Sequence, residues 1–134
     1  MQKNEQKYLS QFHRWLKYNH WNTSFPFEFK AVEDGSRLNY KSDIRDSQLE
    51  CLWLAKHKQL IYKISDASFD NFRPFDSFIF TDSPAYFVIC WYEKGRATCY
   101  IIDIDAIINE INSDSKSLTE ERAKEIAYKI GEIK

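Results

Sequence analysis

Two side chains in the segment SFPFEFKAV, residues 24–32, have the types and spacing needed for phosphodiester hydrolysis. The segment alternates aromatic and polar residues as a β-strand does, so Glu28 and Lys30 project from the same face. A carboxylate there can hold Mg²⁺ or Mn²⁺, and the neighbouring ammonium can orient a water molecule and steady charge on the phosphorus oxygens. The pair therefore predicts a metal-dependent phosphodiesterase.

The Glu-x-Lys spacing occurs three times, starting at Glu5, Glu28 and Glu132, whereas chance gives roughly one occurrence. The first and last lie in segments expected to be helical, where residues two apart do not face each other. Only the pair of Glu28 and Lys30 is therefore expected to act together. The alternative is that both residues lie on the solvated face of an edge strand whose phenylalanines point inward.

A second carboxylate is expected because one ligand seldom holds a hydrated Mg²⁺ ion in place. Asp76 is the first candidate, since it follows a turn and begins a predicted strand, although Asp is also common in turns for structural reasons. Asp66 is the reserve. Glu5 is a third candidate metal ligand, because it projects among the apolar residues of the first helix and so needs a partner, a metal or a frayed helix start.

The elements that must position these residues belong to an α/β or α+β domain, with one mixed β-sheet flanked by helices. Periodicity predicts helices over 4–18, 43–58, 105–111 and 118–131, and strands over 24–32, 60–65, 76–80, 85–92 and 97–104. The strand over 85–92 is apolar on both faces, which predicts a central position. Pro26 places the strand over 24–32 at an edge or at its own beginning.

Two of these helices carry specific expectations about caps and faces. We expect the helix over 43–58 to be capped by Ser42 or Asp43 and to direct Leu49, Leu52 and Trp53 inward. The sequence Ser117-Leu118-Thr119-Glu120 has the pattern of a capping box and is expected to begin the last helix.

Length and composition limit the classes of protein that remain. A chain of 134 residues, 43% hydrophobic and 16% aromatic, with 3 Gly and 3 Pro, predicts one folded domain over residues 1–134. No apolar run approaches the roughly 20 residues that cross a bilayer, and the first residues do not resemble a secretory signal. We therefore expect a cytoplasmic protein without a membrane partner. The three cysteines are expected to be reduced thiols.

Charge is distributed unevenly along the chain. Residues 1–63 contain 11 Lys and Arg against 7 Asp and Glu, whereas residues 64–134 contain 8 against 13. Any anion-facing surface is therefore expected in the first half. The first helix presents a basic stripe that is either a solvated face or a DNA-binding surface that follows a phosphate backbone, and its members are Lys3, Lys7, Arg14 and Lys17.

These motifs resemble the PD-(D/E)XK nuclease superfamily, especially its small Holliday junction resolvases and related phage and bacterial recombination endonucleases. The resemblance covers roughly residues 4–104: a helix with an inward Glu, a strand with Glu28-Phe29-Lys30, a helix with Gln48, and a hydrophobic strand. It implies a restriction-endonuclease-like core and a catalytic site of Glu28, Lys30, Asp76 and Gln48, with Glu5 in the acidic position of the first helix. The family usually places the Asp turn before the (D/E)xK strand, whereas Asp76 follows it here.

The sequence thus predicts a Mg²⁺- or Mn²⁺-dependent DNA endonuclease that acts on branched DNA, with a twofold dimer expected for symmetric cleavage of two strands. If phage-encoded, it would act in the cytoplasm of a bacterial host. The alternative is a catalytically inactive protein of nuclease fold, of phage or mobile-element origin, that binds DNA or inhibits or recruits a protein partner. The acidic second half and the formal net charge of -1 agree with that alternative.

Overall fold

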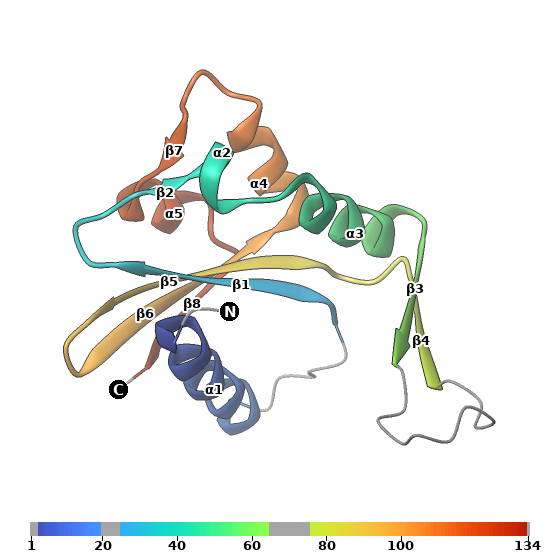
Figure 1. The fold of residues 1–134 in the computed structure, drawn as a ribbon, viewed down its shortest axis with the longest axis horizontal. Helices are drawn as coiled ribbons and strands as arrows, with labels where there is room; N and C mark the ends of the chain where they lie inside the picture. Colours follow the sequence, from blue (N-terminus) through green and yellow to red (C-terminus); the bar gives the residue numbers. More distant parts are fainter. Residues whose placement is uncertain (1–2, 20–24, 65–75, 134) are drawn as a thin grey trace.

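A computed structural model describes residues 3–19, 25–64 and 76–133. Its helices and strands follow one another along the chain as Figure 1 shows. The helices are α1 (Lys3–Tyr18), α2 (Tyr40–Asp43), α3 (Asp46–His57), α4 (Ile104–Ile111) and α5 (Glu120–Ile126). The strands are β1 (Phe27–Glu33), β2 (Leu38–Asn39), β3 (Gln59–Ile64), β4 (Asp76–Thr81), β5 (Tyr86–Glu93), β6 (Arg96–Asp103), β7 (Ser117–Leu118) and β8 (Lys129–Ile133).

The main sheet has four strands in the order β1-β5-β6-β8. β1 runs parallel to β5, while β5 and β6 form an antiparallel hairpin and β8 pairs antiparallel with β6. The fold is therefore mixed α/β with a mixed sheet flanked by helices, as predicted. The first six residues of β5 are buried, which explains the continuous apolar run in its sequence. β1 is an edge strand and Pro26 directly precedes it, so both of the places predicted for this proline are found.

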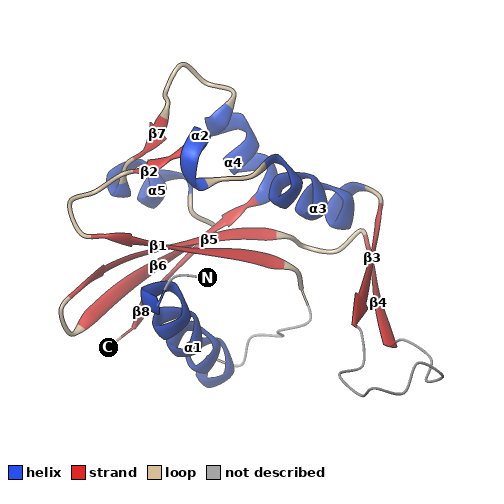
Figure 2. Cartoon of the chain, in the orientation of Figure 1, coloured by secondary structure: helices blue, strands red, loops and turns tan. Residues whose placement is uncertain are grey.

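Helix α1 covers one face of this sheet, and the other helices lie across the opposite face (Figure 2). Tyr8, Phe12 and Leu16 of α1 are buried and join a core cluster that includes Phe29 of β1 and Val88 of β5. The predicted amphipathic helix over 4–18 is confirmed, because its apolar arc is the arc that is buried. No helix among the described ranges has the length and apolar character that crossing a membrane would require.

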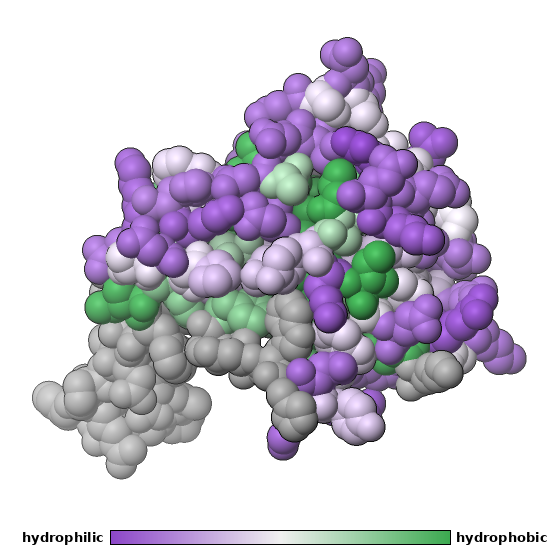
Figure 3. All heavy atoms as spheres, turned by 180° about the vertical axis from the view of Figure 1, so that it is seen from behind, coloured by the Kyte–Doolittle hydropathy of each residue, from purple (hydrophilic) through white to green (hydrophobic). Residues whose placement is uncertain are grey.

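The second core cluster lies between the sheet and the helices α3, α4 and α5. Phe87 and Ile89 of β5 contribute from the sheet, and Ile104 and Ile107 contribute from α4. Because β5 supplies Phe87 and Ile89 to this cluster and Val88 and Cys90 to the other, alternate residues of one strand fill both layers. Hydrophilic residues cover much of the described surface seen from behind, with hydrophobic side chains visible in patches (Figure 3).

The helix predicted over 43–58 is wrong at its start. Asn39 instead caps the short α2, where its side chain accepts hydrogen bonds from the backbone N–H groups of Lys41 and Ser42 at 3.0 and 3.3 Å. Ile44 then has an extended backbone, so α3 begins only at Asp46. Leu52 is buried as predicted, but 36% of Trp53 is exposed.

The helix predicted over 118–131 is also wrong, because three elements occupy that range. Thr119 is the cap of α5, and its hydroxyl accepts a hydrogen bond from the Arg122 N–H at 3.2 Å, whereas Ser117 lies in β7 and pairs with Asn39 of β2. The chain then becomes β8, whose Gly131 and Ile133 are buried and whose Glu132 is exposed. This alternation is the period of a strand, and it is too short to stand out in the sequence.

The hairpin of β3 and β4 forms a separate two-stranded sheet that extends away from α3 (Figure 1). Its register pairs Gln59 with Thr81 at the end nearer α3 and Ile64 with Asp76 at the other end. The predicted strands over 60–65 and 76–80 are thus present, but they do not join the main sheet.

Candidate functional site

Glu28 and Lys30 lie on the edge strand β1 and face away from helix α1. Their neighbours Phe27 and Phe29 pack against Phe12 of α1, with ring centroids 5.5 and 5.6 Å from its ring. Alternation along the strand sends Glu28 and Lys30 to the other face, where both are partly buried. This is the arrangement predicted from the sequence of the segment.

Gln48, in the first turn of α3, contacts Glu28 directly. Its Nε2 donates a hydrogen bond to Glu28 Oε1 at 2.8 Å, while its Oε1 accepts one from the backbone N–H of Arg45 at 3.0 Å. Both ends of the amide are therefore engaged, one at the start of the helix and one at the carboxylate. Gln48 therefore fixes one oxygen of the Glu28 carboxylate relative to the start of α3.

The charge of Glu28 is influenced by three further side chains. Partial burial raises the pKa of the Glu28 carboxyl, Lys30 lowers it, Glu5 raises it and Arg45 lowers it. Of these side chains, Glu5 comes from α1 and Lys30 from β1, and both line one pocket. The structure therefore brings Gln48 into contact with Glu28, on the strand face that also carries Lys30, and places Glu5 with Lys30 in the lining of one pocket.

Beside Lys30 lies a charged pocket of about 380 Å³. Its basic side chains are Lys30, Arg37 and Arg45, and its acidic ones are Glu5, Glu33 and Asp43. Asp43 has a structural role, because its carboxylate accepts a hydrogen bond from the Asn39 N–H at 2.8 Å. Sequence reasoning missed Arg37 and Arg45, and the only signal for them was the positive balance of the first half of the chain.

An apolar pocket of about 510 Å³ contains Glu28 and Gln48 in its wall. β1 and the residues before it contribute Phe25, Pro26 and Phe27; α3 contributes Ser47, Cys51 and Leu52; and the β3–β4 hairpin contributes Leu60 and Phe80. Glu28 therefore lies in the wall of an apolar pocket, while Lys30, two residues along the same face, lines a charged one.

Asp76 is not in the sheet that carries Glu28. Its backbone begins β4 opposite Ile64, at the end of the hairpin remote from α3. Its side chain lies outside the described part of the structure, as do Asp66 and the side chain of Lys3. Among the described residues, no group of three or more His, Cys, Asp and Glu side chains could hold a metal ion.

The basic stripe predicted on α1 is exposed where it is described. Lys7, Arg14 and Lys17 are all on the surface, opposite the arc that packs on the sheet. Lys7 also extends over the ring of Tyr8, with its Nζ 5.3 Å from the ring centroid. The stripe is thus a cationic surface that is exposed to solvent at Lys7, Arg14 and Lys17.

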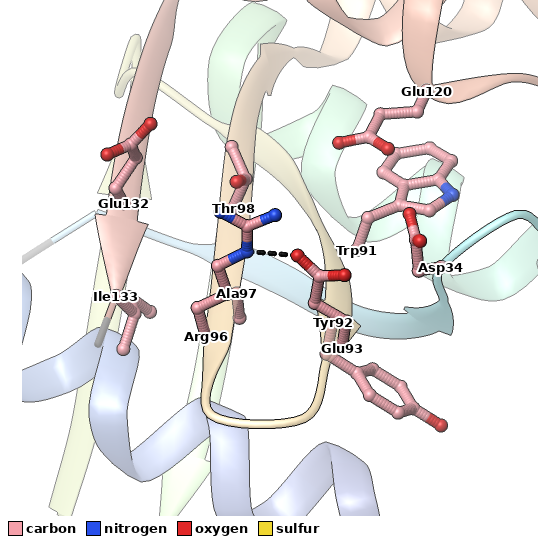
Figure 4. Close-up of a pocket in the computed structure, with 10 residues that line it drawn as sticks. All are labelled: Asp34, Trp91, Tyr92, Glu93, Arg96, Ala97, Thr98, Glu120, Glu132 and Ile133. Atoms are coloured by element: carbon pink, nitrogen blue, oxygen red, sulfur yellow. Dashed lines mark hydrogen bonds and ion pairs between the residues drawn. The ribbon is translucent and has the colours of Figure 1, made fainter.

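An acidic pocket of about 470 Å³ lies near the ends of β5, β6 and β8 (Figure 4). Its four carboxylates come from different parts of the chain, namely Asp34, Glu93, Glu120 and Glu132. Arg96 is ion-paired with Glu93, and Glu120 accepts a hydrogen bond from the Tyr100 hydroxyl at 2.7 Å. This pocket has the opposite electrostatic character from the surface of α1.

No known protein family, curated protein or solved structure matches this chain. The functional argument therefore depends on the side chains around Glu28 and on the pockets beside it. Together with Glu28, the charged pocket combines four carboxylates (Glu5, Glu28, Glu33 and Asp43) with three cations (Lys30, Arg37 and Arg45). Carboxylates can hold a hydrated divalent cation, and the cations can bind a phosphate ester.

Proposed function

We propose that this protein is a Mg²⁺- or Mn²⁺-dependent DNA endonuclease that hydrolyses phosphodiester bonds in branched or recombination DNA, with a core and site of PD-(D/E)XK type. One observation carries the proposal: Gln48 holds Glu28 at 2.8 Å on the strand face that also carries Lys30. Glu5 lines the same pocket as Lys30. These residue types on α1, β1 and α3 support the proposal.

The residues present fit Mg²⁺ or Mn²⁺, because such ions are commonly held by one or two carboxylates together with water and substrate phosphate. Glu28 and Glu5 would hold the ion. When bound, it would polarise the phosphoryl oxygens and lower the pKa of a coordinated water. The prediction that Asp76 adds a further ligand stays a prediction.

The side chains of this chain would divide the remaining work. Lys30 would orient the attacking water and steady the charge that develops on the phosphorus oxygens. Arg37 and Arg45, which line the same pocket as Lys30, would bind the neighbouring phosphates. Lys7, Arg14 and Lys17 would extend that contact along α1. A twofold dimer, acting in the cytoplasm, would present two equivalent sites to a four-way junction.

Cleavage of a labelled four-way junction in the presence of Mg²⁺ tests the proposal. Lys30→Ala is expected to lower the single-turnover rate by about 100-fold or more, with unchanged melting temperature. Lys124→Ala, an exposed lysine on α5, is the matched control and should cleave like the natural chain. Equal cleavage by Lys30→Ala and the natural chain would overturn the assignment, and so would absence of cleavage by the natural chain with both Mg²⁺ and Mn²⁺.

A second candidate function is a binding protein without catalysis. The acidic pocket in Figure 4 favours it, because a concave surface with four carboxylates suits a basic protein partner. The lack of three converging metal ligands among the described residues agrees with it. Titration with Mn²⁺ separates the two functions: a melting temperature that rises at millimolar Mn²⁺ in the natural chain, but not in Glu28→Gln, supports the nuclease. No rise in the natural chain favours the binding protein.

A further inference from the structure

The two pockets that flank the Glu28–Lys30 face differ sharply in chemistry. The pocket that contains Glu28 is lined mainly by aromatic and aliphatic side chains from β1, α3 and the hairpin. The pocket that contains Lys30 is lined mainly by charged groups, of which three are basic (Lys30, Arg37 and Arg45) and three are acidic (Glu5, Glu33 and Asp43). Glu28 and Lys30 are two residues apart on one face, a rise of about 7 Å, so the apolar and charged surfaces are adjacent.

We propose that the apolar pocket binds an unpaired nucleobase of the DNA, and that this site therefore acts on a single-stranded or unpaired segment of a branched substrate. This inference deepens the proposed function and rests on it. A nucleotide, like the site, has an apolar part beside a charged part, since a flat, largely apolar base is joined through a sugar to an anionic phosphate. The base would enter the apolar pocket while its phosphate meets Lys30, Arg37 and Arg45.

The size and lining of the apolar pocket support a base as its occupant. Its volume of about 510 Å³ is within the range of pockets that bind small organic molecules. Phe80 of the β3–β4 hairpin lines the pocket, and aromatic side chains stack on bases with little dependence on sequence.

Access favours an unpaired base over a paired one. A base within a duplex is stacked and hydrogen-bonded, and it must be extruded before it can enter a pocket in a protein, whereas a base at a branch point or in a single strand is already free. The energy of extrusion would therefore select unpaired segments without any contact that reads their sequence.

Cys51 provides a probe of the pocket. It is exposed and lines the pocket, whereas Cys90 and Cys99 are buried, so a maleimide should modify Cys51 first. Filling the pocket with Cys51→Trp changes an exposed position of α3 and should leave the core intact. Cys51→Ser is the matched control, because it keeps the size of the side chain.

The experiment compares three DNAs of equal length by fluorescence anisotropy at low salt, with a chelator present to prevent cleavage. They are an oligothymidylate, the same backbone with abasic sites, and a duplex. The natural chain and Cys51→Ser should bind the oligothymidylate about tenfold more tightly than either of the other two. Cys51→Trp should lose this preference, and only the oligothymidylate should slow modification of Cys51.

Equal affinity for the oligothymidylate and the abasic strand would overturn the inference, as would binding of neither DNA or an unchanged preference in Cys51→Trp. These outcomes are separable from the fate of the proposed function. Junction cleavage that requires Lys30, without any preference for bases, would retain the nuclease and remove the base pocket. A clear preference for the base-containing strand in a protein that cleaves no junction with Mg²⁺ or Mn²⁺ would retain the base pocket and remove the nuclease.

Discussion

Gln48 Nε2 lies 2.8 Å from Glu28 Oε1 and donates a hydrogen bond to it, although the two residues are 20 positions apart. The same amide accepts a hydrogen bond from the Arg45 N–H. The beginning of α3 and the carboxylate on β1 are therefore held by a single side chain. A helix terminus that positions a partly buried carboxylate is a rigid support for a site, because both elements are anchored in the core.

Gln48→Leu should remove both hydrogen bonds while keeping the approximate volume of the side chain. We expect a loss of about 1–2 kcal/mol in the free energy of unfolding, measured by urea denaturation. Without the donor, the pKa of the Glu28 carboxyl should rise, as measured by NMR titration. Ser47→Ala, on the exposed side of the same turn, should change neither quantity, and an unchanged Glu28 titration in Gln48→Leu would contradict the positioning role.

The pKa of Glu28 makes stability depend on pH. Because burial raises this pKa above the ordinary value of 4.5, the folded state binds the proton more tightly than the unfolded state. This contribution to stability is present below pH 4.5 and is lost as pH rises through the folded pKa. Glu28→Gln should therefore melt higher than the natural chain at pH 7, and the difference should shrink in acid. A lower melting temperature of Glu28→Gln at pH 7 would contradict this prediction.

Two buried tyrosines should respond oppositely to removal of the hydroxyl. The Tyr40 hydroxyl is buried and has no hydrogen-bond partner among the described residues, and burial raises its pKa to about 12. Tyr100 donates to Glu120 at 2.7 Å. We expect Tyr40→Phe to be neutral or stabilising and Tyr100→Phe to cost about 1 kcal/mol or more in unfolding free energy. Equal losses of unfolding free energy in the two variants would contradict the view that the Tyr100 hydroxyl is hydrogen-bonded and the Tyr40 hydroxyl is not.

Gly131 of β8 is required by its contact with α1. A Cβ atom at this position would lie 2.7 Å from the Trp15 ring, which is shorter than any normal contact, and Trp15 packs within the core cluster beneath α1. Gly131→Ala should therefore lower the unfolding free energy by about 1–3 kcal/mol, measured by denaturation. Glu132→Ala, at the exposed neighbouring position, should change it by less than about 0.5 kcal/mol.

An ionic cluster joins the C-terminal end of α3 to the N-terminal end of α4, and it should weaken in acid. Lys56 Nζ lies 2.8 Å from Asp103 and 2.7 Å from Asp105, and His57 Nε2 lies 2.7 Å from Asp105. Burial raises the pKa of Asp105, whereas the hydrogen bonds and charges of Lys56 and His57 lower it. The lowering is larger, so the pKa of Asp105 lies below its ordinary value. The contribution of the Asp105 carboxylate to the free energy of unfolding is therefore present above the ordinary pKa of 3.8. It is lost as pH falls through the lower pKa that this group has in the folded state.

Lys56→Met tests this cluster. We expect it to lower the unfolding free energy at pH 7 by about 1 kcal/mol, because the partly exposed groups are screened by solvent. The difference from the natural chain should shrink as pH falls below 3.8, because protonation of Asp105 removes its ion pair with Lys56. A constant difference across this pH range would mean that Lys56 acts through packing of its aliphatic stem.

Several elements could be predicted because their signals are local. Tyr8, Phe12 and Leu16 recur on one helical arc, and the uninterrupted apolar run of β5 requires burial on both faces. The last segment could not be predicted in this way. A capping pattern at Ser117 resembles the start of a helix, but pairing of Ser117 with β2 competes with it, and the alternation in β8 covers only five residues.

The sequence by itself determined the strand pattern that sends Glu28 and Lys30 to one face, the amphipathic α1 and the central position of β5, because each depends on neighbours within a few residues. Only the tertiary structure decided that Gln48 meets Glu28, that Arg37 and Arg45 join Lys30 in one pocket, and that Asp76 begins a strand outside the main sheet. Those relationships depend on how separate elements pack, and packing is set by the summed burial of many side chains. No single sequence motif is therefore enough to predict how these elements pack.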